Sequence, residues 1–251
     1  MSWAARDLEP YAIQRHFGVK VAFVPLVIGS YSPDILSKWF VYGINVLGVE
    51  FKADDPVQFH RGWPGVGFTH SLGYGLLIAA LIWLIFGSRI WAWSFLLGHW
   101  AHALTDAGDT IGTMLFFPLT TETFGLGAWA YAGQYDRLID AGAYFSGLGF
   151  VWDGVFLVYG LLCWRMFQRE YFHDVIVKAD PRFWGWAGRW LPEAALLALY
   201  RTSFFYGATR WVAWLIWAHV VHDFPVDLSW AAHSGSTPLT TDGARRAAAS
   251  T

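Results

Sequence analysis

Long apolar segments limit what this chain can fold into more than any other feature. Runs that approach the length of a bilayer-spanning helix cover, in chain order, residues 21–49, 71–87, 90–107, 141–167 and 194–222. A helix needs about 20 apolar residues to cross the hydrocarbon core of a bilayer. Only 14% of the residues are charged, whereas soluble domains average about 25%. The sequence therefore predicts an all-α protein, a multi-pass integral membrane helical bundle with four or five transmembrane helices.

No linker or internal repeat divides these apolar segments, so we expect a single transmembrane domain over residues 1–233. The remaining segment, 234–251, is small and polar, which predicts a disordered C-terminal tail. The formal net charge of −2 provides no basic field that would attract nucleic acid. We expect membrane lipids as partners, with other membrane-protein subunits as an alternative, and no nucleic acid.

Basic residues indicate which side of the membrane each helix end faces, because loops rich in Lys and Arg stay in the cytoplasm. The segment 165–189 is rich in them, and the region near the N-terminus contributes Arg6, Arg15 and Lys20. We therefore expect segment 165–189 and the N-terminus on the cytoplasmic side. Asp34, His70 and Asp106 then fall at the outer ends of their helices.

The segment Gly98–Asp106 places His99, His102 and Asp106 inside an otherwise apolar helix. Residues three, four and seven positions apart share a helix face, so these three side chains lie within an arc of about 60°. Imidazole and carboxylate groups are ligands that divalent metals prefer in proteins. The segment therefore indicates a metal site, and the alternative is a buried polar cluster satisfied by hydrogen bonds alone.

Two charged residues, Asp153 and Arg210, lie inside other apolar segments. Charges within membrane segments usually pair with one another or face a cavity. Because each lies about ten residues from the outer end of its predicted helix, we expect an internal ion pair between them. In the alternative arrangement, an arginine in a polar pocket would hold a lipid phosphate.

The polar motifs also follow a specific order along the chain: Ser32-Pro33-Asp34, His60-Arg61-Gly62, Thr69-His70-Ser71, Gly98–Asp106 and Phe117-Pro118. This order resembles the YdjM-type family of LexA-regulated inner-membrane metal-dependent hydrolases, over residues 16 to about 120. The family is distantly similar to zinc-dependent phospholipase C. The resemblance implies a multi-pass protein of the cell inner membrane that binds a divalent metal, zinc above all, with manganese or iron as alternatives.

Carried over residue by residue, the resemblance implies a set of metal ligands: His16, Asp34, His70, His102 and Asp106. It implies catalytic roles for Asp34 and for Arg61, which would contact an anionic substrate. From its position in the same helix as His102, His99 is a further catalytic candidate: an extra ligand, a tolerated polar residue or, most readily, a group that supports the ligands. The implied function is a membrane-bound hydrolase that acts on a phosphoester or lipid-type substrate at the outer side of the membrane.

The chain departs from the family pattern in two places. Pro33-Asp34-Ile35-Leu36-Ser37 stands where the family has Pro-Asp-x-Asp-His, so a carboxylate and a histidine are missing. An insertion, Trp63–Gly67, separates Arg61 from His70. These departures support a second hypothesis, in which the chain is a non-catalytic accessory subunit of a larger membrane complex and its metal site is degenerate.

Overall fold

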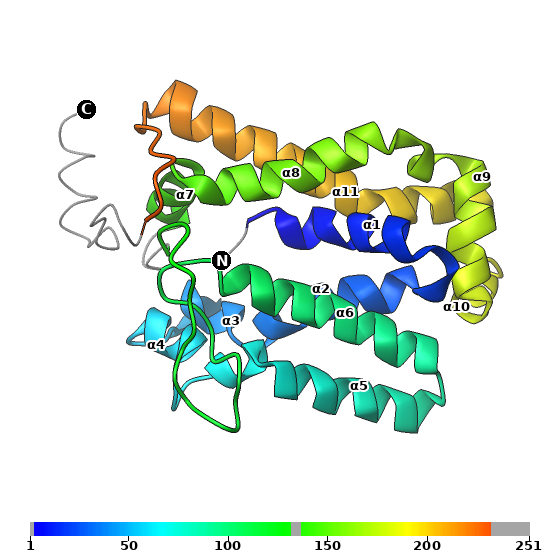
Figure 1. Cartoon of the computed structure of the whole chain (residues 1–251), viewed down its shortest axis with the longest axis horizontal. Coiled ribbons are helices and arrows are strands. Elements are labelled where there is room, and N and C mark those ends of the chain that lie inside the picture. Colours follow the sequence, from blue (N-terminus) through cyan, green and yellow to red (C-terminus); the bar gives the residue numbers. More distant parts are fainter. Residues whose placement is uncertain (1–2, 132–136, 232–251) are drawn as a thin grey trace.

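Helices form nearly all of the regular structure, which confirms the predicted all-α class (Figure 1). The computed structural model describes residues 3–131 and 137–231, so the tail predicted at 234–251 lies outside the described residues. The longer helices are α1 (Ala5–Phe17), α2 (Phe23–Ile35), α5 (Leu72–Phe86), α6 (Arg89–Asp106), α7 (Arg137–Phe145), α8 (Leu148–Leu162) and α11 (Glu193–Ile216).

Short elements connect these helices. In the first half of the chain they are η1 (Gly18–Lys20), α3 (Lys38–Val41), the antiparallel strands β1 (Ile44–Val46) and β2 (Val49–Phe51), α4 (Pro56–Arg61) and η2 (Gly67–His70). In the second half they are η3 (Trp164–Phe167), α9 (Arg169–Tyr171), η4 (Phe172–Val177), α10 (Pro181–Ala187) and η5 (Trp217–Val221).

The turn between α5 and α6 is set by two residues. Gly87 ends α5 in the left-handed conformation, with φ 64°, which glycine adopts without a steric penalty. Ser88 then begins α6, because its hydroxyl accepts a hydrogen bond from the backbone N–H of Trp91. The two helices consequently lie side by side and run in opposite directions (Figure 1).

Helices α2 and α6 run in the same direction with their backbones in close contact. A Cβ atom added at Gly98 of α6 would overlap the carbonyl oxygen of Leu26 of α2, and one added at Gly29 of α2 would overlap the carbonyl oxygen of Phe95. Small residues permit such close approach of two helices. The C-terminal ends of α2 and α6 therefore meet, which brings Asp34 close to the last turn of α6.

Helix α1 lies between two groups of helices, with α2, α5 and α6 on one side and α7, α8 and α11 on the other (Figure 1). It carries polar side chains that are buried: Asp7, Glu9 and Gln14. Asp7 forms an ion pair with Arg210 of α11, 2.9 Å long, while Arg6 forms an ion pair with Asp34 of α2. Charged contacts of α1 therefore join the two groups of helices.

Asp153 and Arg210 do not pair with each other, so the ion pair expected from the sequence is wrong. The carboxylate of Asp153 instead accepts hydrogen bonds from the backbone N–H groups of Trp3, Ala4 and Ala5, at 3.2, 2.7 and 3.0 Å. The first N–H groups of a helix have no partner within the helix. Asp153 of α8 thus caps the N-terminus of α1 across the interior, while Arg210 binds Asp7.

An aromatic core holds α1 against the second group of helices. Tyr11 of α1 packs against Phe167, Tyr200 and Phe204, with ring centroids 5.4 to 5.5 Å apart. All four side chains are buried. Burial of such large apolar surfaces is the dominant favourable term in packing these elements.

By length and apolar composition, no helix in the described part of the chain could cross a bilayer alone. One pair passes the same test when its members are taken together, namely residues Leu138–Phe145 and Leu148–Leu162, which are bent by 76° at the break between them.

The two ends of α1 lie at opposite ends of the molecule. The ion pair between Arg6 and Asp34 places the start of α1 at the end where α2 and α6 finish, and Figure 1 shows α1 running from there toward α9 and α10. The sequence predicts that the N-terminus lies in the cytoplasm and that Asp34 faces the outer side. Because Arg6 and Asp34 lie at the same end of the molecule, these two predictions cannot both be correct.

Candidate metal centre

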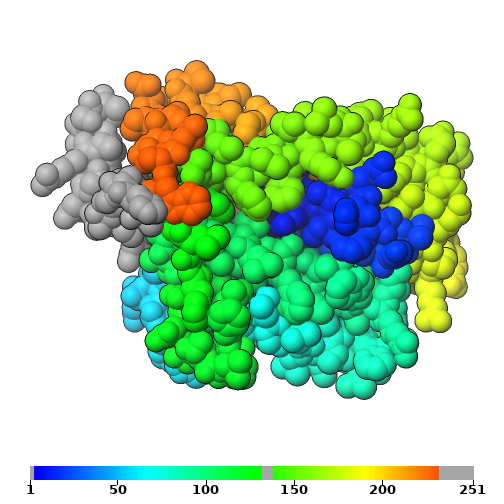
Figure 2. All heavy atoms as spheres, viewed as in Figure 1, coloured from blue at the N-terminus to red at the C-terminus, as the bar shows by residue number. Residues whose placement is uncertain are grey.

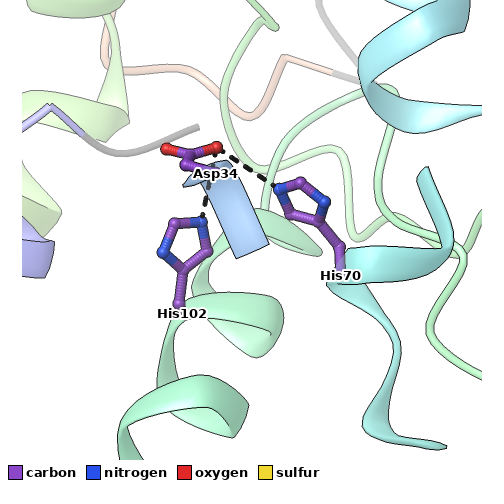
Figure 3. A group of neighbouring side chains, drawn as sticks. All are labelled: Asp34, His70 and His102. Atoms are coloured by element: carbon purple, nitrogen blue, oxygen red, sulfur yellow. Dashed lines mark ion pairs between the residues drawn. The ribbon is translucent and has the colours of Figure 1, made fainter. Parts of the chain in front are cut away.

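The side chains that the sequence marks for metal binding come together from separate elements at one end of the helices. Asp34 lies in the last turn of α2, and His70 ends η2. His102 and Asp106 lie one turn apart in the last part of α6. Figure 3 shows the Asp34 carboxylate above the imidazole rings of His70 and His102, which both point toward it.

His60 of α4 is a further member of this cluster that the sequence analysis did not assign. Helix α4 begins at Pro56, after Asp55 accepts a hydrogen bond from the N–H of Gln58, an ordinary N-cap. At its other end, His60 and Arg61 are both buried. The one signal in the sequence is that His60 precedes Arg61 in the His-Arg-Gly motif.

The ligand atoms lie within a few ångströms of one another. Oδ1 of Asp34 is 3.5 Å from Nε2 of His60, 3.5 Å from Nε2 of His70 and 4.0 Å from Nε2 of His102. Oδ2 of Asp106 is 3.5 Å from Nε2 of His70 and 3.2 Å from Nε2 of His102. Two sets satisfy the spacing for a shared ion, Asp34 with His70 and His102, and His60 with His70 and Asp106.

Four of these atoms are buried without a hydrogen-bond partner among the described residues: Nε2 of His60, His70 and His102, and Oδ1 of Asp34. A buried polar atom left unsatisfied costs about 1–3 kcal/mol, and such atoms are rare in native structures. Four such atoms lie within a few ångströms of one another, in two overlapping sets that could hold an ion. A cation is the group that lone pairs of nitrogen and oxygen can hold together.

The other nitrogen of each imidazole ring is already engaged. Nδ1 of His102 donates to the carbonyl oxygen of Ser30 at 2.5 Å, Nδ1 of His60 lies 2.7 Å from the hydroxyl of Ser37, and Nδ1 of His70 lies 3.3 Å from that of Thr69. A hydrogen bond at one ring nitrogen sets the tautomer and orients the other nitrogen toward a metal. These contacts direct all three Nε2 atoms inward.

Burial also keeps two of the rings neutral. It lowers the pKa of His60 well below its usual range, and it lowers the pKa of His70 to about 3. Burial removes the imidazole ring from water, which disfavours its protonated, positively charged form. A neutral imidazole has the free lone pair that a metal requires.

Basic side chains surround the carboxylates. Arg6 pairs with Oδ2 of Asp34, and Nζ of Lys38 lies 3.7 Å from its Oδ1. Nη2 of Arg61 lies 2.7 Å from Asp106 and 3.3 Å from Asp109. These basic groups offset charge of the carboxylates, and a bound divalent cation would add further positive charge that favours an anionic ligand.

Each of the two sets offers three ligand atoms that could share one divalent ion. Imidazole nitrogens and carboxylate oxygens suit zinc, manganese or iron. The two overlapping sets share His70, and its Nε2 atom has one lone pair, so His70 cannot bind two ions through that atom.

His99 and His16 lie apart from the cluster. Nδ1 of His99 accepts from the hydroxyl of Ser32 at 2.7 Å, and its Nε2 donates to the carbonyl oxygen of Ser71 at 3.0 Å. Both nitrogens of this buried ring therefore hold neighbouring elements together. His16 is exposed in the last turn of α1, beside the ring of Phe17, at the far end of that helix from Arg6.

The fold and site define a helical protein with a buried His–Asp cluster able to hold a metal. A family model described as the YdjM inner membrane protein matches residues 5–172, more than half of the 251 residues. The chain belongs to the YdjM inner membrane protein family, and is therefore a membrane protein, as its composition predicts. No curated protein and no solved structure matches it.

Proposed function

We propose that this protein is a membrane-bound, metal-dependent hydrolase whose divalent ion, zinc in first place, takes its ligands from the cluster of Asp34, His60, His70, His102 and Asp106. The observation that carries the proposal is the convergence of four buried ligand atoms that have no hydrogen-bond partner among the described residues. A bound divalent ion supplies Lewis acidity and lowers the pKa of water at such a site.

Arg61 is the residue that would hold an anionic substrate beside the ion. Its Nη2 atom binds Asp106 and Asp109, whereas its Nε and Nη1 atoms are buried without a hydrogen-bond partner among the described residues. The ring of Tyr131 lies 5.4 Å from the guanidinium carbon. A guanidinium group binds a phosphate or carboxylate through two parallel hydrogen bonds, which supports a phosphoester or lipid-type substrate.

The arrangement of basic residues supports a multi-pass topology with the cluster at the outer side. Arg15, Lys20 and Arg89 lie at the ends of α1, η1 and the start of α6, opposite the cluster, as does the basic segment 165–189. By the positive-inside rule, that end faces the cytoplasm. The start of α1 then lies with Asp34 at the outer side, rather than in the cytoplasm.

The test is elemental analysis of the full chain purified in detergent, with hydrolysis of a simple phosphodiester measured on the same samples. We expect close to one equivalent of a divalent metal and metal-dependent hydrolysis, both lost in His102→Ala. His173→Ala is the matched control, because His173 is exposed and contacts Glu193 away from the cluster. A metal-free protein, or equal metal content in His102→Ala, would contradict the proposal.

A second function, that of a non-catalytic subunit in a larger membrane complex, is favoured by one specific observation. Arg6 and Arg61 already pair with Asp34 and Asp106, so charge balance in the cluster needs no ion. Purification of the chain with stoichiometric partner proteins and without metal would support this function over hydrolysis.

A further inference from the structure

A cavity of about 440 Å³ lies at the end of the molecule opposite the metal cluster. It is lined by the last turn of α1 and by residues from η3 to η4, and its polar lining residues are Arg15, Arg165, Gln168, Glu170, Tyr171 and Asp174. In Figure 2, the blue C-terminal end of α1 lies next to the yellow-green atoms of this region. A cavity of this volume is large enough for a small polar group.

The charges in this cavity are suited to a phosphate group. Arg15 and Arg165 form no ion pair with any residue in the described part of the chain. The guanidinium carbon of Arg15 lies 5.9 Å from the ring centre of Tyr171, so this ring supports the guanidinium group at the cavity. Two guanidinium groups make a favourable set for a phosphodiester.

The two acidic residues of the same cavity differ in whether they form an ion pair. Asp174 is neutralised by Lys178, 2.7 Å away on the next turn. Glu170 has no ion pair with a described residue. The cavity therefore presents one carboxylate beside its two guanidinium groups, an arrangement complementary to a group that carries an ammonium next to a phosphate.

An exposed apolar stripe leads along α8 to this cavity. Val151, Val155, Val158 and Leu162 share one helix face by their spacing, and the last three are 55%, 54% and 82% exposed. Arg165 follows Leu162 by three residues. In a protein of the inner-membrane family, such a stripe is a surface on which acyl chains pack favourably.

We propose that this cavity binds the headgroup of a zwitterionic phospholipid of the phosphatidylethanolamine type. Arg15 and Arg165 bind the phosphodiester, and Glu170 binds the ammonium group. The acyl chains lie along the stripe formed by Val151, Val155, Val158 and Leu162. This inference is independent of the proposed hydrolase function, because it uses none of the residues of the metal cluster.

The test is lipid binding by the purified full chain, measured by native mass spectrometry after titration with phosphatidylethanolamine, phosphatidylglycerol or soluble glycerophosphoethanolamine. We expect tighter binding of phosphatidylethanolamine than of the other two. The double variant Arg15→Gln, Arg165→Gln should weaken it about tenfold, since two charge-assisted contacts are lost.

The matched control is the double variant Arg182→Gln, Arg189→Gln, which removes the same charge from exposed residues outside the cavity. It should bind phosphatidylethanolamine like the unaltered protein. Equal binding of phosphatidylglycerol overturns the assignment of Glu170 to an ammonium group. Equal binding of the soluble headgroup overturns the lipid as the source, and equal weakening in both double variants overturns the site itself.

Discussion

Nδ1 of His102 donates a hydrogen bond to the carbonyl oxygen of Ser30, 2.5 Å away, across the contact between α6 and α2. Nearer the start of both helices, the N–H of Ala22 donates to Oγ of Ser94 at 2.8 Å. Both pairs are separated by 72 positions in the sequence, so the two helices keep one register along their length. The same register places Asp34 opposite Asp106, and it directs Nε2 of His102 toward both carboxylates.

Replacing His60 should weaken metal binding although the sequence did not single out this residue as a ligand. His60→Ala removes one of the candidate donor atoms and should lower metal affinity about tenfold to a hundredfold. His16→Ala should leave the affinity unchanged, because His16 is exposed far from the cluster. Competition with a chromogenic chelator measures both, and a stronger effect of His16→Ala would show that the cluster is not the metal site.

Close packing of α2 on α6 should be sensitive to one methyl group. Gly98→Ala places a Cβ atom against the carbonyl oxygen of Leu26, so the helices must move apart at a cost of about 1–3 kcal/mol. Gly185→Ala in α10 meets nothing within 4 Å and should be neutral or slightly stabilising. Thermal unfolding in detergent compares the two variants, and equal midpoints would contradict the close approach.

Removing the cap of α1 should destabilise the protein. Asp153→Ala leaves the N–H groups of Trp3, Ala4 and Ala5 without their acceptor, at a cost of about 2 kcal/mol or more. Asp153→Asn retains an acceptor oxygen and should cost less. Asp174→Ala, at an exposed position, is the control. If Asp153→Ala unfolds at the same temperature as Asp174→Ala, the cap does not stabilise the fold.

Stability of the metal-free protein should fall on acidification. Burial keeps the pKa of His60 and His70 below the ordinary value, which is about 6.5 in an unfolded chain. Below that pH the unfolded chain binds more protons than the folded protein, so folding stability decreases, by at most about 1.4 kcal/mol per pH unit for each ring.

Unfolding at pH 7.5 and pH 5.5, in excess chelator, measures this dependence. Replacing one of the two rings, as in His60→Asn, should reduce the pH dependence, because one group that takes up a proton on unfolding has been removed. A pH dependence as steep in His60→Asn as in the unaltered protein would show that other groups cause it.

Helical class and the pairing of His102 with Asp106 were accessible from the sequence, because both depend on local periodicity. Residues four apart share a helix face whatever the helix packs against. The Pro33-Asp34 and His70 motifs were accessible only through their order along the chain. His60 was not singled out, because nothing in a six-residue helix indicates where its end will lie relative to α2 and α6.

The roles of His99, Asp153 and Arg210 depended on packing. His99 precedes His102 by three residues, and a rotation of about 60° around the helix directs it to Ser32 and Ser71 instead of to the carboxylates. Asp153 and Arg210 have matching depth and opposite charge, yet the helices that carry them both pack against α1. Asp153 instead accepts hydrogen bonds from the N-terminus of α1, and Arg210 pairs with Asp7 of α1.

The sequence by itself determined that the chain is helical and apolar, and which side chains share the last turns of α6, because backbone geometry and hydrophobic burial act through local spacing. Only the tertiary structure decided which polar residues meet. Asp34, His60 and His70 reach the same point as His102 because glycine contacts set the register of two helices and short elements end beside them. Such relationships arise between distant segments, where no periodicity within one segment can specify them.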